Sequence, residues 1–338
     1  MVSNQPNSNS KNQYAADEIS ADSPNRRYAC SIVIRAYNEE KHIGRLLDGI
    51  LQQTIQDVEI ILVDSGSTDA TLEIALRYPV QAVHIRPDEF TFGRSLNWGI
   101  AASHGEVIII ASAHVYPVYP DWLERLLATL ADPQVGLAYG KQRGDGNAQF
   151  SEQQVFARWY PDRSNLRQAH PFCNNANAAI RRSLWEAHAY DESLSGLEDL
   201  AWAHWAVGQG YSLAYVAEAE VVHVHNETVR GVYNRYRREA MAFKHIFPHE
   251  HFGLRDFLRL SLTNIASDLW HAAGQGLFRR SLGSIFWFRL MQFWGTYRGY
   301  RQSGPLTWQL RQTFYYPRGI ALSAQAAERN VEPIQYNE

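Results

Sequence analysis

The hydrophobic pattern of the chain begins with two apolar runs that each end in a polar turn. The first run, SIVIR at 31–35, leads into the turn AYNEE, and the second run, VEIILV, ends at Asp64. A segment with helical spacing of apolar residues lies between them. Continuous apolar runs of this kind are typical of parallel strands that are buried on both faces of a sheet. The pattern therefore predicts a β-α-β unit, with the polar residues at the carboxyl edge of the sheet, where open sheets bind ligands.

The same alternation continues and predicts one α/β domain with a mostly parallel sheet flanked by helices. Helices are expected over Thr68–Arg77, Ser95–Ser103 and the amphipathic stretch 121–132. An apolar strand over 106–117 carries a polar break at 112–114, and residues 212–226 are expected to form two short strands. From residue 228 onward the pattern is helical. No GxGxxG follows the first strand, which argues against a dinucleotide site.

Composition supports a sizeable core, because the 338 residues are 45% hydrophobic and 20% charged. The two cysteines, Cys30 and Cys173, lie far apart, which suggests neither a disulfide framework nor a zinc cluster. We therefore expect a reducing, cytoplasmic compartment. The polar N-terminus lacks the apolar segment of a secretory signal. No apolar stretch approaches the roughly 20 residues that a membrane-spanning helix needs.

Charge is unevenly distributed along the chain. The net charge is −3, yet residues 228–320 hold 14 Lys and Arg against 4 Asp and Glu. This asymmetry, with many Trp and Phe residues, favours helices that lie on an anionic membrane surface at the inner face of the cell membrane. The alternatives are an ordinary helical extension that packs on the acidic domain, or a homodimer contact. We expect no nucleic-acid partner.

The motifs RAYNEE and VDSGSTDAT, in this order and at this separation, resemble the nucleotide-sugar-binding half of family 2 glycosyltransferases. The resemblance covers about residues 31–233 and implies a GT-A type, Rossmann-like fold with a helical C-terminal extension. It implies an inverting enzyme that moves a sugar from a nucleoside-diphosphate sugar to an acceptor hydroxyl, on a glycan or lipid-linked sugar, in cell-envelope polysaccharide or glycolipid assembly. The expected divisions are a disordered tail (1–27), a donor half (28–140), an acceptor half (141–230) and the helical extension (231–325).

The resemblance also implies the donor-binding residues. Ala36, Tyr37, Glu39 and Asp64 would line the base and ribose, where a carboxylate accepts hydrogen bonds from a base N–H and a hydroxyl. Arg94 matches an Arg/Lys-x-x-Asn pattern, and its guanidinium suits bidentate contact with a diphosphate. The alternatives are that Asp64 only caps its turn, as does the nearby Asp69, and that Arg94 is a solvated residue at a helix start.

A divalent metal, Mn²⁺ or Mg²⁺, is implied by the resemblance, although its usual Asp-x-Asp is absent. Ser112, Ala113 and His114 stand at that place. We count Ser112 with the donor site and His114 as a metal ligand, because manganese accepts imidazole beside oxygen ligands. His223 and His225 alternate on a predicted strand, so both point to one side and either can join His114. The alternative is a set of hydrogen-bonded cleft residues, with Arg or Lys stabilising the leaving diphosphate.

The chemistry is predicted to rest on Glu198 and Asp199, which match the family's Glu-Asp motif at a helix start. By resemblance, Asp199 is the general base that takes the proton of the acceptor hydroxyl, and Glu198 positions the base or the acceptor. Both acids are also explained by the helix dipole alone. Asn174, Asn175 and Asn177 are candidate sugar contacts.

Two other functions remain open on the sequence. The missing Asp-x-Asp motivates a glycosyltransferase-like protein that binds a nucleotide-sugar or glycan without turnover. A nucleotidyltransferase shares the α/β plan but usually carries a Gly-rich loop after the first strand, which RAYNEE lacks.

Overall fold

The computed structural model describes residues 28–87, 89–168, 170–224, 228–301 and 331–336. Its strands are β1 (Cys30–Ala36), β2 (Val58–Asp64), β3 (Gln81–His84), β4 (Val107–Ser112), β5 (Val115–Pro117), β6 (Val135–Gly144), β7 (Asn165–Gln168), β8 (Asn177–Arg181) and β9 (Ser212–His223). Its helices are α1 (Ile43–Leu51), α2 (Thr71–Ala75), α3 (Phe92–Ala101), α4 (Trp122–Thr129), α5 (Phe150–Trp159), α6 (Arg182–Ala187), α7 (Glu198–Gly208), α8 (Val229–Ile246), α9 (Leu254–Gly274) and α10 (Phe278–Arg301).

The described strands form a single mixed sheet in the order β3-β2-β1-β4-β8-β6-β9-β5, with β7 paired to β9. The N-terminal half, β3-β2-β1-β4, is parallel throughout, as the apolar runs predict. Antiparallel pairs enter with β8, β5 and β7, while β6 and β9 are parallel. The predicted α/β class is confirmed. The sheet is parallel throughout only in the donor half, which holds β3, β2, β1 and β4.

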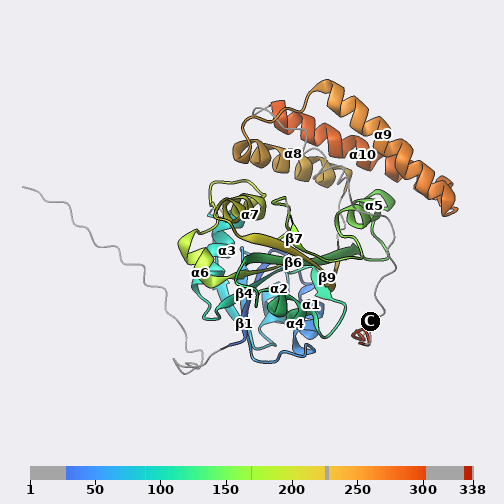
Figure 1. The fold of residues 1–338 in the computed structure, drawn as a ribbon. Coiled ribbons are helices and arrows are strands. Elements are labelled where there is room, and N and C mark those ends of the chain that lie inside the picture. Colours follow the sequence, from blue (N-terminus) through green and yellow to red (C-terminus); the bar gives the residue numbers. More distant parts are fainter. Residues whose placement is uncertain (1–27, 88, 169, 225–227, 302–330, 337–338) are drawn as a thin grey trace, which may run out of the picture.

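Helices cover both faces of this sheet, which explains why its strands are apolar on both sides (Figure 1). One core cluster joins the strands to α1 and α4, through side chains such as Leu46, Ile50 and Leu126. The second cluster, on the other face, joins them to α3 and α7, through side chains such as Ile100 and Trp202. The carboxyl ends of β1 and β4 are thereby fixed from both sides.

Some element boundaries differ from the predictions. Helix α3 begins at Phe92 rather than Ser95, because the Thr91 hydroxyl accepts a hydrogen bond from the Arg94 N–H and caps the helix three residues earlier. The apolar stretch at 106–117 is two strands, β4 and β5, and residues 212–223 form one strand rather than two. Strand β7 was not predicted, since NLRQ has no apolar alternation.

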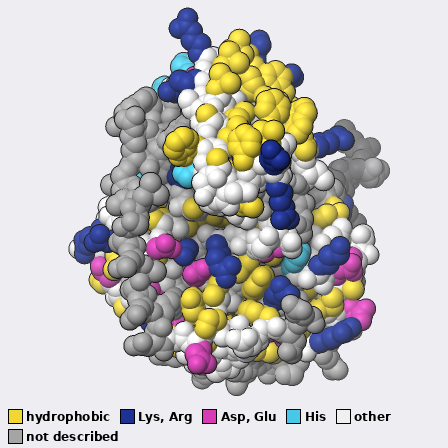
Figure 2. Space-filling model, turned by 90° about the vertical axis from the view of Figure 1, so that its right-hand side faces the viewer, with side chains coloured by type: hydrophobic (Ala, Val, Ile, Leu, Met, Phe, Trp, Pro, Cys, Tyr) yellow, Lys and Arg dark blue, Asp and Glu magenta, His cyan; other side chains and the backbone are white. Residues whose placement is uncertain are grey.

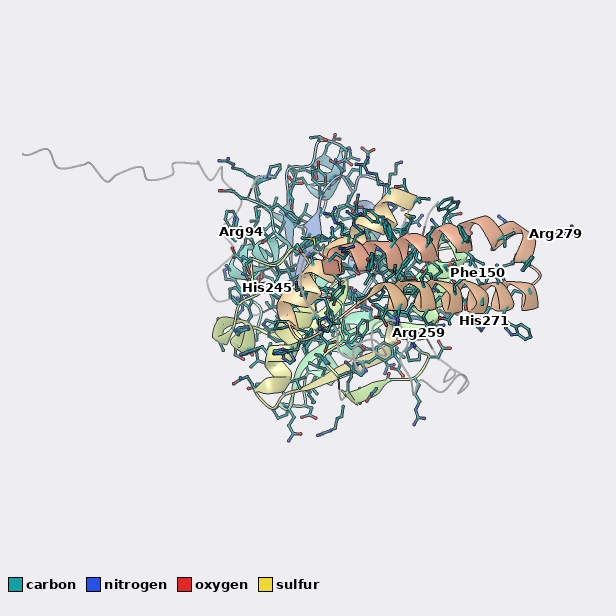
Figure 3. All side chains as sticks on the ribbon, turned by 90° about the horizontal axis from the view of Figure 1, so that it is seen from above. Arg94, Phe150, His245, Arg259, His271 and Arg279 are labelled. Atoms are coloured by element: carbon teal, nitrogen blue, oxygen red, sulfur yellow. The ribbon has the colours of Figure 1, made fainter. Side chains whose placement is uncertain are left out.

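The C-terminal helices α8, α9 and α10 pack together above α7 and α5 (Figure 1). From above, α9 and α10 lie side by side and reach past the sheet (Figure 3). Their contact buries an ion pair: Arg289 Nε lies 2.7 Å from Asp268 Oδ2, and the Ser151 hydroxyl of α5 donates to the same oxygen at 2.6 Å. A paired, hydrogen-bonded charge of this kind ties the helical extension to the body of the protein.

Large apolar side chains of α9 and α10 are exposed: Leu254, Leu258, Leu262, Trp270, Phe278, Leu282, Phe286 and Trp287. Trp270 and Leu262 keep 80% and 66% of their surface exposed. Figure 2 shows apolar side chains gathered over the upper end of the molecule, with Lys and Arg along the border. Among the described residues, no helix is both long and apolar enough to cross a membrane.

Candidate active site

A pocket of about 490 Å³ lies where the carboxyl ends of β1 and β4 meet the first turn of α7 and the middle of α8. This volume is within the range of small-molecule sites. Six of the residues predicted from the sequence to form the site line it: Glu39, Ser112, His114, Glu198, Asp199 and His223. Asn174 and Asn175, predicted as sugar contacts, line it as well. The fold therefore gathers residues from 35 to 239 around one cavity.

Asp199 is a buried carboxylate held by two backbone N–H groups. Its Oδ2 accepts the Asn175 N–H at 3.1 Å and its Oδ1 accepts the Leu200 N–H at 2.8 Å. Burial, and next the negative charge of Glu198, raise the pKa of Asp199 to about 7. A carboxyl group with this pKa is half ionised near neutral pH and can both accept and hold a proton.

Glu198 is the partner of Arg35, which ends the first apolar run. Arg35 Nη1 lies 3.0 Å from Glu198 Oε1, and both side chains are largely buried. The preceding residue, Leu197, has φ of +57°, a left-handed conformation that costs about 1–2 kcal/mol in a non-glycine residue. This turn presents Glu198 and Asp199 together at the start of α7, and Arg35 holds one of the two acids in place.

The two described histidines predicted as metal ligands stack on each other. The ring centroids of His114 and His223 are 5.0 Å apart and their planes differ by 22°. His114 Nδ1 lies 2.7 Å from Glu39 Oε1, and His223 Nδ1 lies 2.7 Å from Gln142 Oε1. An imidazole lone pair lies in the plane of its ring, so two stacked rings do not direct their lone pairs at one point.

A divalent metal does not fit this donor set. In the described parts of the chain, no group of three or more His, Cys, Asp or Glu side chains is arranged to hold a metal ion. The third candidate ligand, His225, lies outside the described residues. Glu39 is engaged with His114, and Ser112 is a weak replacement for a carboxylate ligand. We therefore derive no step of the reaction through a metal.

The other predicted donor residues lie at the same sheet edge but outside the pocket lining. Ala36 is buried opposite Asp64 in the β1–β2 register, and Tyr37, with 57% of its surface exposed, follows at the edge. The Asp64 carboxylate accepts N–H groups of Gly66 and Ser67 at 3.2 Å, the turn-capping arrangement named above as its alternative. Its predicted donor contact stays a prediction.

The motifs RAYNEE and STDAT are joined to each other by hydrogen bonds. The Thr68 N–H donates to Asn38 Oδ1 at 2.8 Å, and the Ala70 N–H donates to Glu40 Oε2 at 3.1 Å. In return, the Glu40 N–H donates to Asp69 Oδ2 at 3.1 Å. Several residues of the two motifs therefore serve to join the two loops to each other at the edge of the donor half.

Arg94 and Asn177 have partners in the protein itself. Arg94 Nε lies 2.7 Å from Glu192 Oε2, and its Nη1 donates to the Glu89 carbonyl (Figure 3 labels Arg94). Asn177 is fully buried and accepts the Trp122 indole N–H at 2.8 Å. The diphosphate contact of Arg94 stays a prediction, and Asn177 serves to join β8 to α4.

Sequence reasoning missed the contribution of α8, the first helix of the C-terminal extension. Arg235, Arg238 and Glu239 of this helix line the pocket, together with His42 and Phe92. The run RYRRE was the available signal, because it is the densest arginine cluster in the chain and begins nine residues after the HVHN segment ends. The helical extension is therefore part of the site.

Comparison with protein families and curated proteins gives one consistent group. The family described as Glycosyl transferase family 2 matches residues 31–188. The O-antigen chain rhamnosyltransferase WbaN of Salmonella anatum is 32% identical over 198 residues, which cover 55% of this chain and 62% of that protein. The O-antigen chain rhamnosyltransferase RfbN of Salmonella typhimurium is 29% identical over 219 residues, covering 61% and 69%. The match thus spans under two thirds of WbaN.

Solved structures share the fold. The mannosyltransferase PcManGT from Pyrobaculum calidifontis, solved with GDP-Man and Mn²⁺, has a TM-score of 0.56 at 20% identity and covers 82% of this chain and 88% of its own. Residues 1–349 of TarS from S. aureus, solved with UDP-GlcNAc, have a TM-score of 0.50 at 14% identity and cover 81% and 91%. At these identities the likeness concerns the fold alone, and it confirms the predicted GT-A type. Residues 31–188 of the chain match the family 2 glycosyltransferases, and the curated relatives support this assignment.

Proposed function

We propose that this protein is an inverting glycosyltransferase that moves a sugar from a nucleoside-diphosphate sugar to an acceptor hydroxyl. The observation that carries the proposal is Asp199, a buried carboxylate with a raised pKa at the wall of a 490 Å³ pocket. Its two oxygens are oriented by the N–H groups of Asn175 and Leu200. An acceptor hydroxyl within hydrogen-bond reach of that carboxylate loses its proton to a base whose pKa suits neutral pH.

The reaction is a single displacement. The acceptor oxygen forms a bond to the anomeric carbon while the bond from that carbon to the diphosphate oxygen breaks. The proton of the hydroxyl passes to the Asp199 carboxylate, and the nucleoside diphosphate leaves with the bonding electron pair. Glu198, held by Arg35 at 3.0 Å, lies beside Asp199, and its negative charge contributes to the raised pKa of the base.

The donor and acceptor classes rest on the relatives. WbaN and RfbN are both named O-antigen chain rhamnosyltransferases. We take an activated rhamnose as the first donor to test, and a glycan or lipid-linked sugar of the cell envelope as the acceptor. The exposed apolar side chains of α9 and α10, two helices that also carry Arg259 and Arg279 (Figure 3), support a position on an anionic membrane surface. The two free cysteines agree with the cytoplasmic face of that membrane.

The test of the reaction is a donor panel. The purified protein is incubated with nucleoside-diphosphate sugars, rhamnose first, with and without a glycan acceptor. Release of nucleoside diphosphate that depends on the acceptor, with inversion of the anomeric centre by NMR, supports the proposal. Donor binding without release from any donor favours the non-catalytic binding protein, and release of pyrophosphate favours a nucleotidyltransferase.

Two further experiments test the predicted metal cofactor and the predicted position on a membrane surface. If transfer is lost in EDTA and restored by Mn²⁺ or Mg²⁺, the predicted metal is supported, whereas full transfer in EDTA removes it. Flotation with vesicles that contain anionic lipid tests the membrane surface. Sedimentation velocity tests the alternative, a homodimer that covers the same face.

A further inference from the structure

Helix α8 supplies positive charge to a pocket whose opposite wall holds the acids. Four arginines, Arg230, Arg235, Arg237 and Arg238, lie within nine residues of this helix. Two of them, Arg235 and Arg238, line the pocket. The acids Glu39, Glu198 and Asp199 line the walls formed by the sheet and α7. Arg35 lines the pocket on the side of these acids and Glu239 on the side of α8, so α8 adds two guanidinium groups and one carboxylate to the site.

The Arg238 side chain lies over an aromatic ring at the pocket. Its Cζ is 4.7 Å from the centroid of the Phe92 ring, and the Cζ of Arg35 is 5.1 Å from the same centroid. Arg35 has a carboxylate partner in Glu198. Among the described residues, no carboxylate oxygen lies within 4 Å of the Arg238 guanidinium nitrogens. A guanidinium stacked on a ring keeps its in-plane N–H groups available, in the fork that matches phosphate oxygens.

The backbone of α8 is held in place from behind by α10. A Cβ added at Gly295 would lie 2.4 Å from the Tyr233 carbonyl oxygen, and one added at Gly299 would lie 2.5 Å from the Arg237 carbonyl oxygen. These two glycines allow the helices to approach closely. At its start, α8 is capped by Thr228, whose hydroxyl accepts the Gly231 N–H at 3.1 Å. The backbone that carries the arginines is therefore held in place, which reduces the conformational entropy lost when they bind a ligand.

The acids around the pocket already have partners in the protein. Glu198 pairs with Arg35, and Glu39 with His114. Arg235 pairs with Glu152 of α5 at 3.3 Å. Arg235 and Arg238 are three residues apart on α8 and therefore lie on the same face of that helix. The described residues do not offer a metal-binding set. Helix α8 therefore supplies positive charge of the kind that a diphosphate needs.

We propose that Arg238, with Arg235 beside it on α8, binds a diphosphate group in the pocket. This inference rests on the proposed function for the identity of the ligand, and two sources share the chemistry. One is the nucleoside diphosphate of the donor, and the other is a diphosphate that links an acceptor glycan to its lipid. In either case the arginine forms charge-assisted hydrogen bonds with phosphate oxygens.

The test compares Arg238→Ala with Arg238→Lys and with Arg230→Ala. Arg230 lies on the same helix, is exposed and does not line the pocket, so its variant is the matched control. Binding of UDP, GDP and TDP is measured by calorimetry in EDTA, with inorganic pyrophosphate as a competitor. We expect Arg238→Ala to weaken binding about 10- to 100-fold, since a hydrogen bond to a charged group has that effect. Arg238→Lys should recover part of the loss, and Arg230→Ala should bind like the wild type.

A second arm distinguishes the two sources. If nucleoside diphosphate binding is unchanged in Arg238→Ala, KM is compared for a lipid-diphosphate-linked acceptor and for the same glycan without the diphosphate. A rise in KM for the first acceptor alone assigns the arginine to the acceptor. The proposal is overturned if neither quantity changes, or if Arg230→Ala changes them equally. Diphosphate binding that depends on Arg238 in a protein without transferase activity would refute the proposed function and leave this inference standing.

Discussion

The two sides of the pocket hold their charged side chains differently. On the side built from the sheet and α7, Arg35 lies against Glu198 and His114 against Glu39, and Asp199 is fixed by two backbone N–H groups. On the side built from α8, Arg238 lies over Phe92 with no carboxylate within 4 Å among the described residues. On the first side the charged side chains have partners within the protein, whereas on the second Arg235 pairs with Glu152 and Arg238 is the group that we propose to bind a ligand. We interpret this difference as that between a wall proposed to accept a proton and a wall proposed to hold an anion.

The largest expected effect concerns the proton acceptor. Replacing Asp199 by Asn removes the base while keeping the shape, so we expect kcat for transfer to fall about 10²- to 10⁴-fold. Donor binding should stay near the wild-type value, because the base contacts the acceptor. Asp162→Asn, an exposed aspartate outside the pocket, is the matched control and should leave transfer unchanged. Wild-type turnover in Asp199→Asn would contradict the assignment.

The next effect concerns the attachment of the C-terminal helices. Removing Asp268 leaves the Arg289 charge buried without its partner, which costs about 3–5 kcal/mol of the free energy of unfolding. Denaturant unfolding of Asp268→Ala measures this loss. In the double variant Asp268→Leu with Arg289→Met, an apolar pair replaces the two charges, so most of the stability should return. An unchanged midpoint in the single variant would show that the helices are not joined through this pair.

A smaller effect links α10 to the α8 wall of the pocket. A methyl group at Gly299 would lie 2.5 Å from the Arg237 carbonyl oxygen and 2.7 Å from Ala240 Cβ, so Gly299→Ala should push α8 away and cost about 1–3 kcal/mol. Because Arg238 moves with α8, KM should rise as well. Gly283→Ala is the control on the same helix: nothing lies within 4 Å of its added Cβ, and alanine favours a helix by about 1 kcal/mol. Equal KM values in the two variants would break the link between the packing of α8 and the site.

The sheet side of the pocket was largely predictable from the sequence, and the α8 side was not. The apolar runs that end at Arg35 and Asp64, and the acids at a helix start, are local signals, and the fold brings them to one edge as expected. The helical character of 229–246 is also local. Its position over the pocket depends on close packing against Gly295 and Gly299 of a helix about 60 residues further along, and no local pattern encodes such a contact.

The errors in the predicted boundaries have the same origin. Residues 212–223 form one strand because β9 pairs with β6 along its length and with β5 at its end, contacts that the polar residues inside the segment conceal. The early start of α3 depends on a single hydroxyl, that of Thr91, which the apolar periodicity does not register. The stacking of His114 on His223 could not be predicted for a different reason. The alternation of side chains along a strand predicts the face on which a histidine lies, but it does not predict the orientation of its ring.

The smallest effect bears on the central claim, that Asp199 is the base. Burial and the charge of Glu198 raise its pKa, while Arg35 lowers it. In Glu198→Gln the negative charge is lost and the Arg35 cation no longer has its carboxylate partner. Both changes favour the ionised form of Asp199, so its pKa must fall. The rate at pH 6 should therefore decline less, relative to the plateau, than in the wild type.

The most direct measurement is the pH dependence of kcat/KM for sugar transfer in the wild type and in Glu198→Gln. With the ionised form of Asp199 as the proposed base, transfer in the wild type should decline tenfold per pH unit below a pKa of about 7. In Glu198→Gln, the same acidic limb should lie about one pH unit lower. An acidic limb that stays at the same pH in both proteins, or a wild-type rate that is flat between pH 5 and pH 8, would contradict the assignment of Asp199 as the base.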